Sequence, residues 1–152
     1  MYCSTYTPPN CNGGFYTTAF DYVAAAGGIT YESAYPYNIT TRRCDITKDD
    51  YAVTVTAWNL VKGEQAMINY ILGGGTLVVV LDASEIGSYQ SGIFPVSGCT
   101  MGYANHAVQL VGVNVAERYW IVRNSWDTWW GDQGYMKIAM VCTSVITALF
   151  AR

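Results

Sequence analysis

The only histidine of the chain, His106, opens the apolar segment HAVQLVGV and is the first candidate for acid–base chemistry. A neutral imidazole near pH 7 is the commonest general base, and it needs a polar neighbour to fix its tautomer. Asn124 follows eighteen residues later, on what we expect to be the neighbouring strand. Trp126 comes two residues after it and could shield an Asn–His hydrogen bond from water. On spacing alone, a histidine satisfied in the core and an asparagine in a turn stay the simpler interpretation.

The elements that would position these residues follow from hydrophobic periodicity. Apolar residues at helical spacing predict a helix over 14–26, ended by Gly27 and Gly28, and the glycine-terminated segment GEQAMINYILGGG predicts a second, short helix. The apolar run Ile138–Ala151 is too short to span a membrane and is interpreted as a buried strand. Alternation or continuous apolar runs predict the other strands, in YAVTVTAWNLV, TLVVVLDA, HAVQLVGV, RYWIVRNSW and YMKIAM. Helix followed by mostly antiparallel strands indicates the α+β class.

Composition excludes several classes of function. With 51% hydrophobic and 12% charged residues, the chain must bury a large core. Eight Lys and Arg are spread along the sequence without a basic stripe, so nucleic acid is not an expected partner, and no membrane partner is expected either. One histidine and no C-x-x-C pair argue against a metal site, and we expect no cofactor. Five scattered cysteines and the acceptor pattern Asn38–Thr40 favour an oxidising compartment. Met1 is followed by a turn-rich polar segment and not by a signal peptide.

Three segments together resemble the papain-like cysteine peptidases, the group that includes the cathepsins. They are NCNGGFYTTAFDYV with AGGITYESAYPY, then NHAVQLVGV, then YWIVRNSWDTWWGDQGYMKI, in family order. The resemblance implies a helical left domain and a β-barrel right domain, with the active site between them. We therefore expect a truncated left domain over residues 1–50 and a right-domain antiparallel β-barrel over 51–152.

The resemblance also implies roles for individual residues. His106 would be the acid–base residue, Asn124 the amide that orients it, and Trp126 the ring that covers both. Five further residues would contact an extended peptide substrate, and core packing is a close rival explanation for the last three: Gly13, Gly14, Ala83, Ala104 and Thr147. Asp127 and Trp129 stand where many relatives carry glycine.

The nucleophile of this family is the residue that the chain does not match. The thiolate segment is expected roughly 130–150 residues before the histidine, which places it about 25 to 45 residues before Met1. The resemblance pairs Cys3 with Cys44 and Cys99 with Cys142, and leaves Cys11 unpaired because its usual partner lies in that absent segment. We therefore expect the isolated chain to be catalytically incomplete.

Three hypotheses remain open from the sequence. The first is the carboxy-terminal part of a papain-like peptidase, lysosomal or extracellular, that acts on peptide or protein substrates. In this hypothesis the missing amino-terminal segment is either lost from the sequence or supplied as a separate chain. The second is a non-enzymatic homologue that acts as a peptide-binding or inhibitory module. The third, from patterns alone, is a small secreted disulfide-bonded β domain with a structural or carbohydrate-binding role. An ordered series of three motifs favours the first.

Overall fold

A computed structural model describes residues 13–37, 44, 46–47, 51–54, 56–98, 102–142 and 147–151 of the 152-residue chain, with residues 141 and 147–151 described by their backbone alone. The chain divides into two compact units. The first comprises Met1–Asn59 with Ala151–Arg152, and the second comprises Leu60–Phe150. We predicted a domain boundary at residue 50. It stays a prediction, because a compact unit is not by itself a domain.

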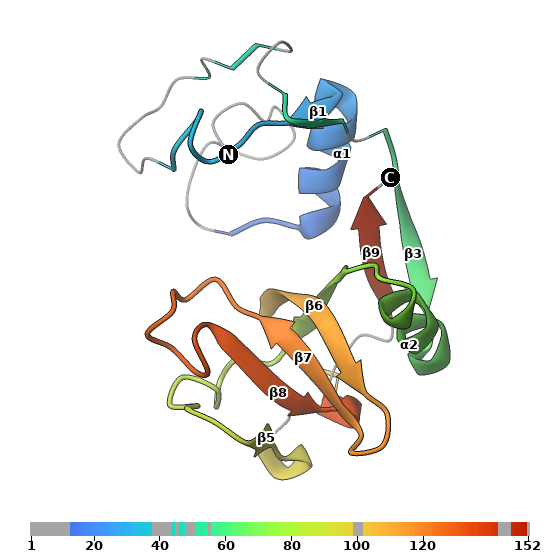
Figure 1. Ribbon diagram of the computed structural model, residues 1–152, viewed down its shortest axis with the longest axis vertical. Coiled ribbons are helices and arrows are strands. Elements are labelled where there is room, and N and C mark those ends of the chain that lie inside the picture. Colours follow the sequence, from blue (N-terminus) through green and yellow to red (C-terminus); the bar gives the residue numbers. More distant parts are fainter. Residues whose placement is uncertain are drawn as a thin grey trace. The chain divides into compact units, whose positions relative to one another are not determined.

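In the described part of the chain, two helices are followed mainly by strands (Figure 1). The elements are α1 Tyr16–Ala26, β1 Gly28–Ile29, β2 Val53–Thr54, β3 Trp58–Lys62, α2 Glu64–Leu72, β4 Leu77–Leu81, β5 Ile93–Phe94, the 3-10 turn Val96–Gly98, β6 His106–Asn114, β7 Tyr119–Arg123, β8 Tyr135–Ala139, the 3-10 turn Met140–Cys142 and β9 Thr147–Ala151. The predicted α+β class is confirmed, and both predicted helices are present.

The main sheet has seven strands in the order β3-β9-β4-β6-β7-β8-β5. Its centre is antiparallel, with β4, β6, β7 and β8 paired in turn, while the two-residue β5 joins β8 in parallel. The predicted closed barrel is wrong for the described part of the chain, because β3 and β5 stand at opposite ends of the strand order. A two-residue strand at one end offers few backbone groups for closing a barrel.

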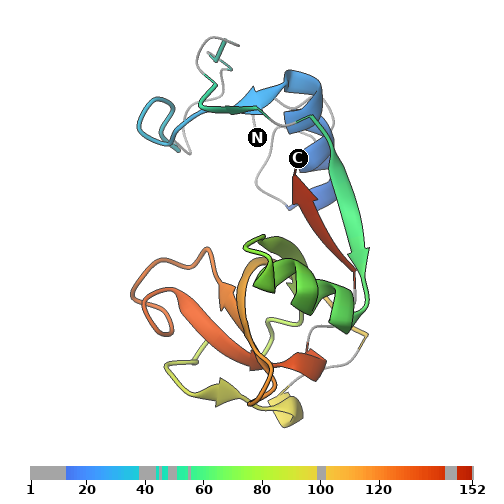
Figure 2. The same cartoon turned by 45° about the vertical axis from the view of Figure 1, so that its right-hand side comes forward.

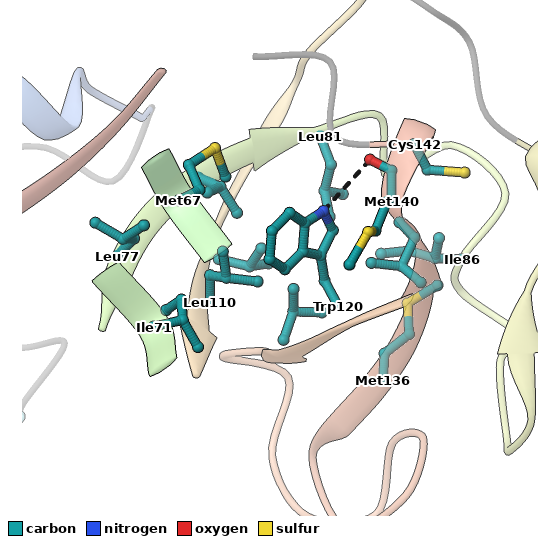
Figure 3. Packing of buried hydrophobic residues seen from close by; sticks show 14 of the residues in the cluster. Met67, Ile71, Leu77, Leu81, Ile86, Leu110, Trp120, Met136, Met140 and Cys142 are labelled. Carbon is teal, nitrogen blue, oxygen red and sulfur yellow. Dashed lines mark hydrogen bonds between the residues drawn. The ribbon is translucent and has the colours of Figure 1, made fainter. Parts of the chain in front are cut away.

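The hydrophobic core of the second unit lies between this sheet and α2. Trp120 of β7 is fully buried, and its Nε1 donates a hydrogen bond to the carbonyl oxygen of Met140 at 3.3 Å. Figure 3 shows its indole between side chains of α2, including Met67, and side chains such as Met136 of β8. A buried indole needs an acceptor for its N–H, so this bond fixes the ring within the core.

Helix α2 packs against β6, as Figure 2 shows from a second side. It buries Met67, Ile68 and Ile71, which recur at helical spacing on one face. Gly63 precedes the helix and Gly73 follows it, as the glycine pattern predicted. Burial of this face against β6 holds one side of the strand that begins with His106.

The first unit contains α1 and the short antiparallel pair β1 and β2. Gly27 ends α1 in the left-handed conformation, with φ of 95°, and its N–H bonds the carbonyl oxygens of Val23 and Ala24, which confirms the predicted C-cap. None of the eleven residues of α1 is buried. The indole of Trp58 donates a hydrogen bond to Asp21 of the helix at 2.7 Å, which ties α1 to the start of β3.

The prediction of one continuous strand over Ile138–Ala151 is wrong. Strand β8 ends at Ala139, a 3-10 turn covers Met140–Cys142, and β9 begins only at Thr147. The N–H of Met140 bonds the carbonyl oxygen of Arg118, and the oxygen of Met140 accepts from the Trp120 indole. Both backbone groups of Met140 are therefore engaged outside a strand ladder, which hydrophobicity alone could not indicate.

Candidate active site

His106 and Asn124 come together as the sequence predicted. His106 is the first residue of β6, and Asn124 directly follows β7, the strand next to it. The imidazole Nε2 lies 2.8 Å from Asn124 Oδ1, a hydrogen-bonding distance. Asn124 is only 9% exposed and His106 is half-buried, so the bond is sheltered while the imidazole keeps some access to solvent.

The surroundings of Asn124 determine the tautomer of the imidazole. The backbone N–H of Ser125 also points at Asn124 Oδ1, at 2.8 Å. An N–H can only donate, so the atom that it faces must be the amide oxygen. The same oxygen faces His106 Nε2, which must then carry the proton, and Nδ1 keeps the lone pair. An imidazole arranged in this way can accept or deliver a proton at Nδ1 without releasing Asn124.

The Trp126 ring lies against the imidazole, and its role in shielding the site stays a prediction. The ring centroids of His106 and Trp126 are 5.0 Å apart, with 30° between the planes. Trp126 in turn meets Trp130 edge-on at 5.3 Å, and Trp130 is buried with its Nε1 donating to the carbonyl oxygen of Ile86 at 3.1 Å. This series of rings anchors the cover over His106 in the core of the second unit.

The loop between β7 and β8 carries Asn124 and Trp126 and is built from unusual backbone conformations. The N–H of Asn124 bonds the carbonyl oxygen of Gly134 at 2.9 Å, which closes the loop. Gly131 has φ of 61°, and a Cβ there would lie 2.6 Å from the carbonyl oxygen of Tyr135. Asp127 also has a positive φ, of 69°, which explains why a glycine is common at this place in the family pattern. Its own Oδ1 accepts from the N–H of Thr128 at 2.6 Å.

Four of the five predicted substrate-contact residues are described with their side chains or as glycine, and the fifth by its backbone alone. Gly13 and Gly14 are exposed in the first unit, ahead of α1, and Gly13 has φ of 91°. Ala83 follows β4 and is half-buried against the core, whereas Ala104 is exposed two residues before His106. Thr147 begins β9, and its side chain lies outside the described residues. Their roles toward a substrate stay predictions.

Two of the five cysteines, Cys44 and Cys142, lie in the described part of the chain. Cys44 and Cys142 are disulfide-bonded, so neither carries a free thiol. Cys3, Cys11 and Cys99 lie outside the described residues. The pairings Cys3–Cys44 and Cys99–Cys142, and the unpaired state of Cys11, therefore stay predictions.

Two further residues beside the site were not predicted, Asp82 and Asn105. Asn105 immediately precedes His106, and its side chain reaches across to the segment that follows β4. Asp82 is a carboxylate only 8% exposed at the end of that strand. In the sequence, the only feature that could have pointed to Asn105 is its position next to the only histidine.

Among the described residues, no group of three or more His, Cys, Asp or Glu side chains could hold a metal ion. Within that part of the chain, neither helix is long and apolar enough to cross a bilayer.

Sequence comparison assigns the family. The model of the papain family cysteine proteases matches residues 1–147, so the chain belongs to that family. Digestive cysteine proteinase 3 of Homarus americanus is 36% identical over 143 residues, which are 90% of this chain and 44% of that protein. Cathepsin S of Mus musculus is 36% identical over 140 residues, 88% of this chain and 41% of that protein. The chain thus spans less than half the length of the curated relatives that it matches.

Solved structures agree with this assignment. The digestive procathepsin L2 proteinase from Tenebrio molitor larval midgut superposes with a TM-score of 0.82 at 33% identity, covering 93% of this chain and 48% of that one. The digestive procathepsin L 3 from the same tissue gives a TM-score of 0.85 at 28% identity, covering 98% and 52%. The chain therefore has a papain-like fold, and the resemblance in its three motifs is confirmed at the level of family.

Proposed function

We propose that this chain is the acid–base half of a papain-type cysteine peptidase, and that it is catalytically incomplete by itself. The observation that supports the proposal is the short bond between His106 Nε2 and Asn124 Oδ1 under the Trp126 ring. A structural histidine has no need of an oriented amide and an aromatic cover at once. A general base needs a fixed tautomer and a sheltered partner.

In the proposed reaction, the thiolate, His106 and Asn124 each have one role. A cysteine thiolate attacks the peptide carbonyl carbon, and a thioester forms as the C–N bond breaks. The imidazolium of His106 gives the proton from Nδ1 to the departing amine. In the second half, Nδ1 accepts a proton from water as the water attacks the thioester, and the acid product and the thiolate are released. Asn124 holds Nε2–H throughout, so the ring does not turn away from the reacting atoms.

The thiolate itself would come from sequence outside this chain. Cys44 and Cys142 are in disulfides and cannot ionise to a nucleophile. The family pattern also places the nucleophile upstream of His106 by more residues than precede it here. Removing a nucleophile typically costs several orders of magnitude in rate, so we expect no measurable turnover from these residues alone.

The substrate, by the same proposal, is an extended peptide or protein segment that lies along Gly13 and Gly14. Glycine at such an edge allows the backbone of a substrate to approach closely. Ala83, Ala104 and Thr147 would shape the pocket for one substrate side chain. Disulfide-bonded Cys44 and Cys142 support a lysosomal or extracellular location, because disulfides persist in oxidising compartments.

The test compares the 152-residue chain with the product of its complete transcript, using a fluorogenic peptide and a peptidyl epoxide that labels reactive thiols. We expect the chain alone to show neither turnover nor labelling. We expect the complete product to hydrolyse the peptide, and His106→Ala to lower kcat by about 10³-fold or more.

A matched control is Asn114→Ala, at the far end of β6, which should leave turnover nearly unchanged. Turnover by the 152-residue chain, with one cysteine fully labelled, would refute catalytic incompleteness. A complete product that binds peptides without cleaving them would instead favour the non-enzymatic peptide-binding homologue.

A further inference from the structure

The carboxylate of Asp82 is buried beside the candidate site without a part in the chemistry proposed above. It follows the last residue of β4 and is only 8% exposed. Its Oδ1 accepts the hydroxyl of Ser84 at 2.6 Å and the N–H of Ser84 at 3.0 Å. Burying a carboxylate is costly unless hydrogen bonds compensate it, so a buried Asp at this place requires a reason.

The side chain of Asn105 connects this carboxylate to the strand of the histidine. Asn105 Oδ1 accepts the N–H of Ala83 at 2.8 Å, and its Nδ2 lies 3.4 Å from Asp82 Oδ1 and 3.4 Å from Ser84 Oγ. Its backbone N–H also bonds the carbonyl oxygen of Leu81 at 3.1 Å. Backbone and side chain of one residue thus hold the segment after β4. We call Asp82, Ser84 and Asn105 the β4–β6 clasp.

The position of the clasp relates it to the imidazole. Leu81 and His106 are opposite each other in the ladder of β4 and β6, and they are its last pair. The first residue of a strand frays easily unless a bond beyond it holds the chain. Asn105 supplies that bond on one side of His106, and Asn124, the residue after β7, bonds the imidazole on the other. A shift of His106 by a fraction of an ångström would lengthen its bond to Asn124 at once.

A simple turn motif would explain part of this geometry. The bonds from Asp82 to Ser84 span two residues and occur in many Asx turns. They do not account for the bonds of Asn105, which join segments more than twenty residues apart in the sequence. Of the three residues of the clasp, Asn105 is therefore the one whose substitution should change the position of His106.

We propose that Asn105, held by the buried carboxylate of Asp82, is a positioning residue that keeps the His106 imidazole in the Nε2–H tautomer on Asn124. Its value for catalysis rests on the proposed role of His106. The effect on the imidazole can be measured without turnover, so the positioning role can fail while the peptidase assignment stands, and the reverse.

The experiment uses the full 152-residue chain labelled with 15N-histidine. Because the chain has one histidine, its two ring nitrogens give unambiguous signals that report the tautomer. Under conditions in which the imidazole is neutral, we expect wild type to show the Nε2–H tautomer with a slowly exchanging ring proton. Asn105→Ala should mix the tautomers and speed exchange of that proton by at least about tenfold, because local opening exposes it.

The matched control is Asn114→Ala, at the opposite end of the same strand. Asn114 makes bonds of the same kind, accepting the N–H of Glu117 at 2.9 Å and donating to its carboxylate at 2.9 Å. A merely structural role predicts equal effects of the two alanine variants on the ring proton. Equal effects, or a wild-type imidazole in Asn105→Ala, would overturn the proposal.

A second pair of variants decides the question if Asn105→Ala does not fold. Asn105→Asp keeps an acceptor for the N–H of Ala83 but places a second carboxylate beside Asp82, which should speed ring-proton exchange. The double variant Asn105→Asp with Asp82→Asn again has one amide and one carboxylate at this contact. We expect it to recover slow exchange to within about threefold of wild type. Exchange in the double variant as fast as in Asn105→Asp would contradict the role given to the clasp.

Discussion

The two compact units bury their side chains in different ways. In the described part of the chain, every buried hydrophobic side chain lies between Met67 and Cys142, all in the second unit. In the first unit α1 buries none of its residues, and Phe15 at its start is 76% exposed. The same apolar helical spacing thus leads to full burial of three side chains in α2 and to no more than partial burial in α1.

This difference shows where the candidate site obtains its rigidity. His106, Asn124 and Trp126 all stand on strands or loops whose other side chains enter the core of the second unit. A site held on packed elements keeps its geometry, because the rotamers of its supports are fixed. The acid–base pair therefore depends on the second unit, and each of the following tests probes that dependence or the contrast with the first unit.

The largest expected effect is the loss of the central indole. Trp120→Ala removes a fully buried side chain and its bond to Met140, and should lower the free energy of unfolding by about 3–5 kcal/mol. Phe15→Ala in the first unit should stay within about 0.5 kcal/mol of wild type. Urea unfolding followed by far-UV circular dichroism measures both. If the two variants lose similar amounts of free energy of unfolding, Phe15 is part of a packed core.

Next in size is a substitution in the loop that carries Asn124. Gly131→Ala combines a positive φ of 61° with a Cβ only 2.6 Å from the oxygen of Tyr135, and should cost about 3 kcal/mol. Gly74→Ala has φ of 88° but open space around the new Cβ, so it should cost about 1 kcal/mol. Thermal unfolding of the two variants compares them. If Gly74→Ala proves the more damaging, steric contact is not what requires glycine at position 131.

A smaller effect is expected at Asp127, where the family pattern has glycine. Because φ is 69°, a side chain without a local hydrogen bond is strained there, and Asp127→Ala should be less stable than Asp127→Gly by about 1 kcal/mol. The same thermal unfolding assay applies. Equal stability of the two variants would show that the loop relaxes instead of holding this conformation.

The smallest effect concerns a tyrosine of the first unit. Burial raises the pKa of Tyr22 above its ordinary value of 10.0, and the neighbouring phenols of Tyr51 and Tyr35 raise the pKa further. The folded state therefore favours the protonated phenol. Its contribution to stability is complete below pH 10 and declines as the pH rises through the folded pKa.

Titration of the Tyr22 Cζ signal by NMR measures this shift. Tyr51→Phe removes a neighbouring phenol and should lower the pKa of Tyr22 toward its ordinary value. Tyr103→Phe, in the second unit, should leave the pKa of Tyr22 unchanged. An ordinary pKa for Tyr22 in wild type would mean that even this local burial in the first unit does not persist in solution.

Much of the fold was predictable from local signals. Helical spacing with terminal glycines predicted α1 and α2, and apolar runs predicted β4, β6, β7 and β8. The failures were of a different kind. Ile138–Ala151 is mostly apolar, yet the tertiary bonds of Met140 end the strand. Closure of a barrel depends on which strands meet at the edges.

The candidate site was also predicted only in part. His106, Asn124 and Trp126 suggested an oriented imidazole under an aromatic cover only together with the family resemblance, because their spacing alone favoured a core histidine and a turn asparagine. Asp82 and Asn105 were not predicted, because nothing in the sequence distinguishes a buried aspartate, or an asparagine bonded to a remote segment, from the same residue in an ordinary turn.

The sequence by itself determined the family, the class of fold and the side chains able to do acid–base chemistry, because these follow from residue type and short spacing. Only the tertiary structure decided that Leu81 stands opposite His106, that the oxygen of Asn124 faces Nε2, and that Asp82 is buried beside them. The physical reason is that a hydrogen bond holds only within a few tenths of an ångström. Such distances between remote segments are set by the packing of the whole second unit.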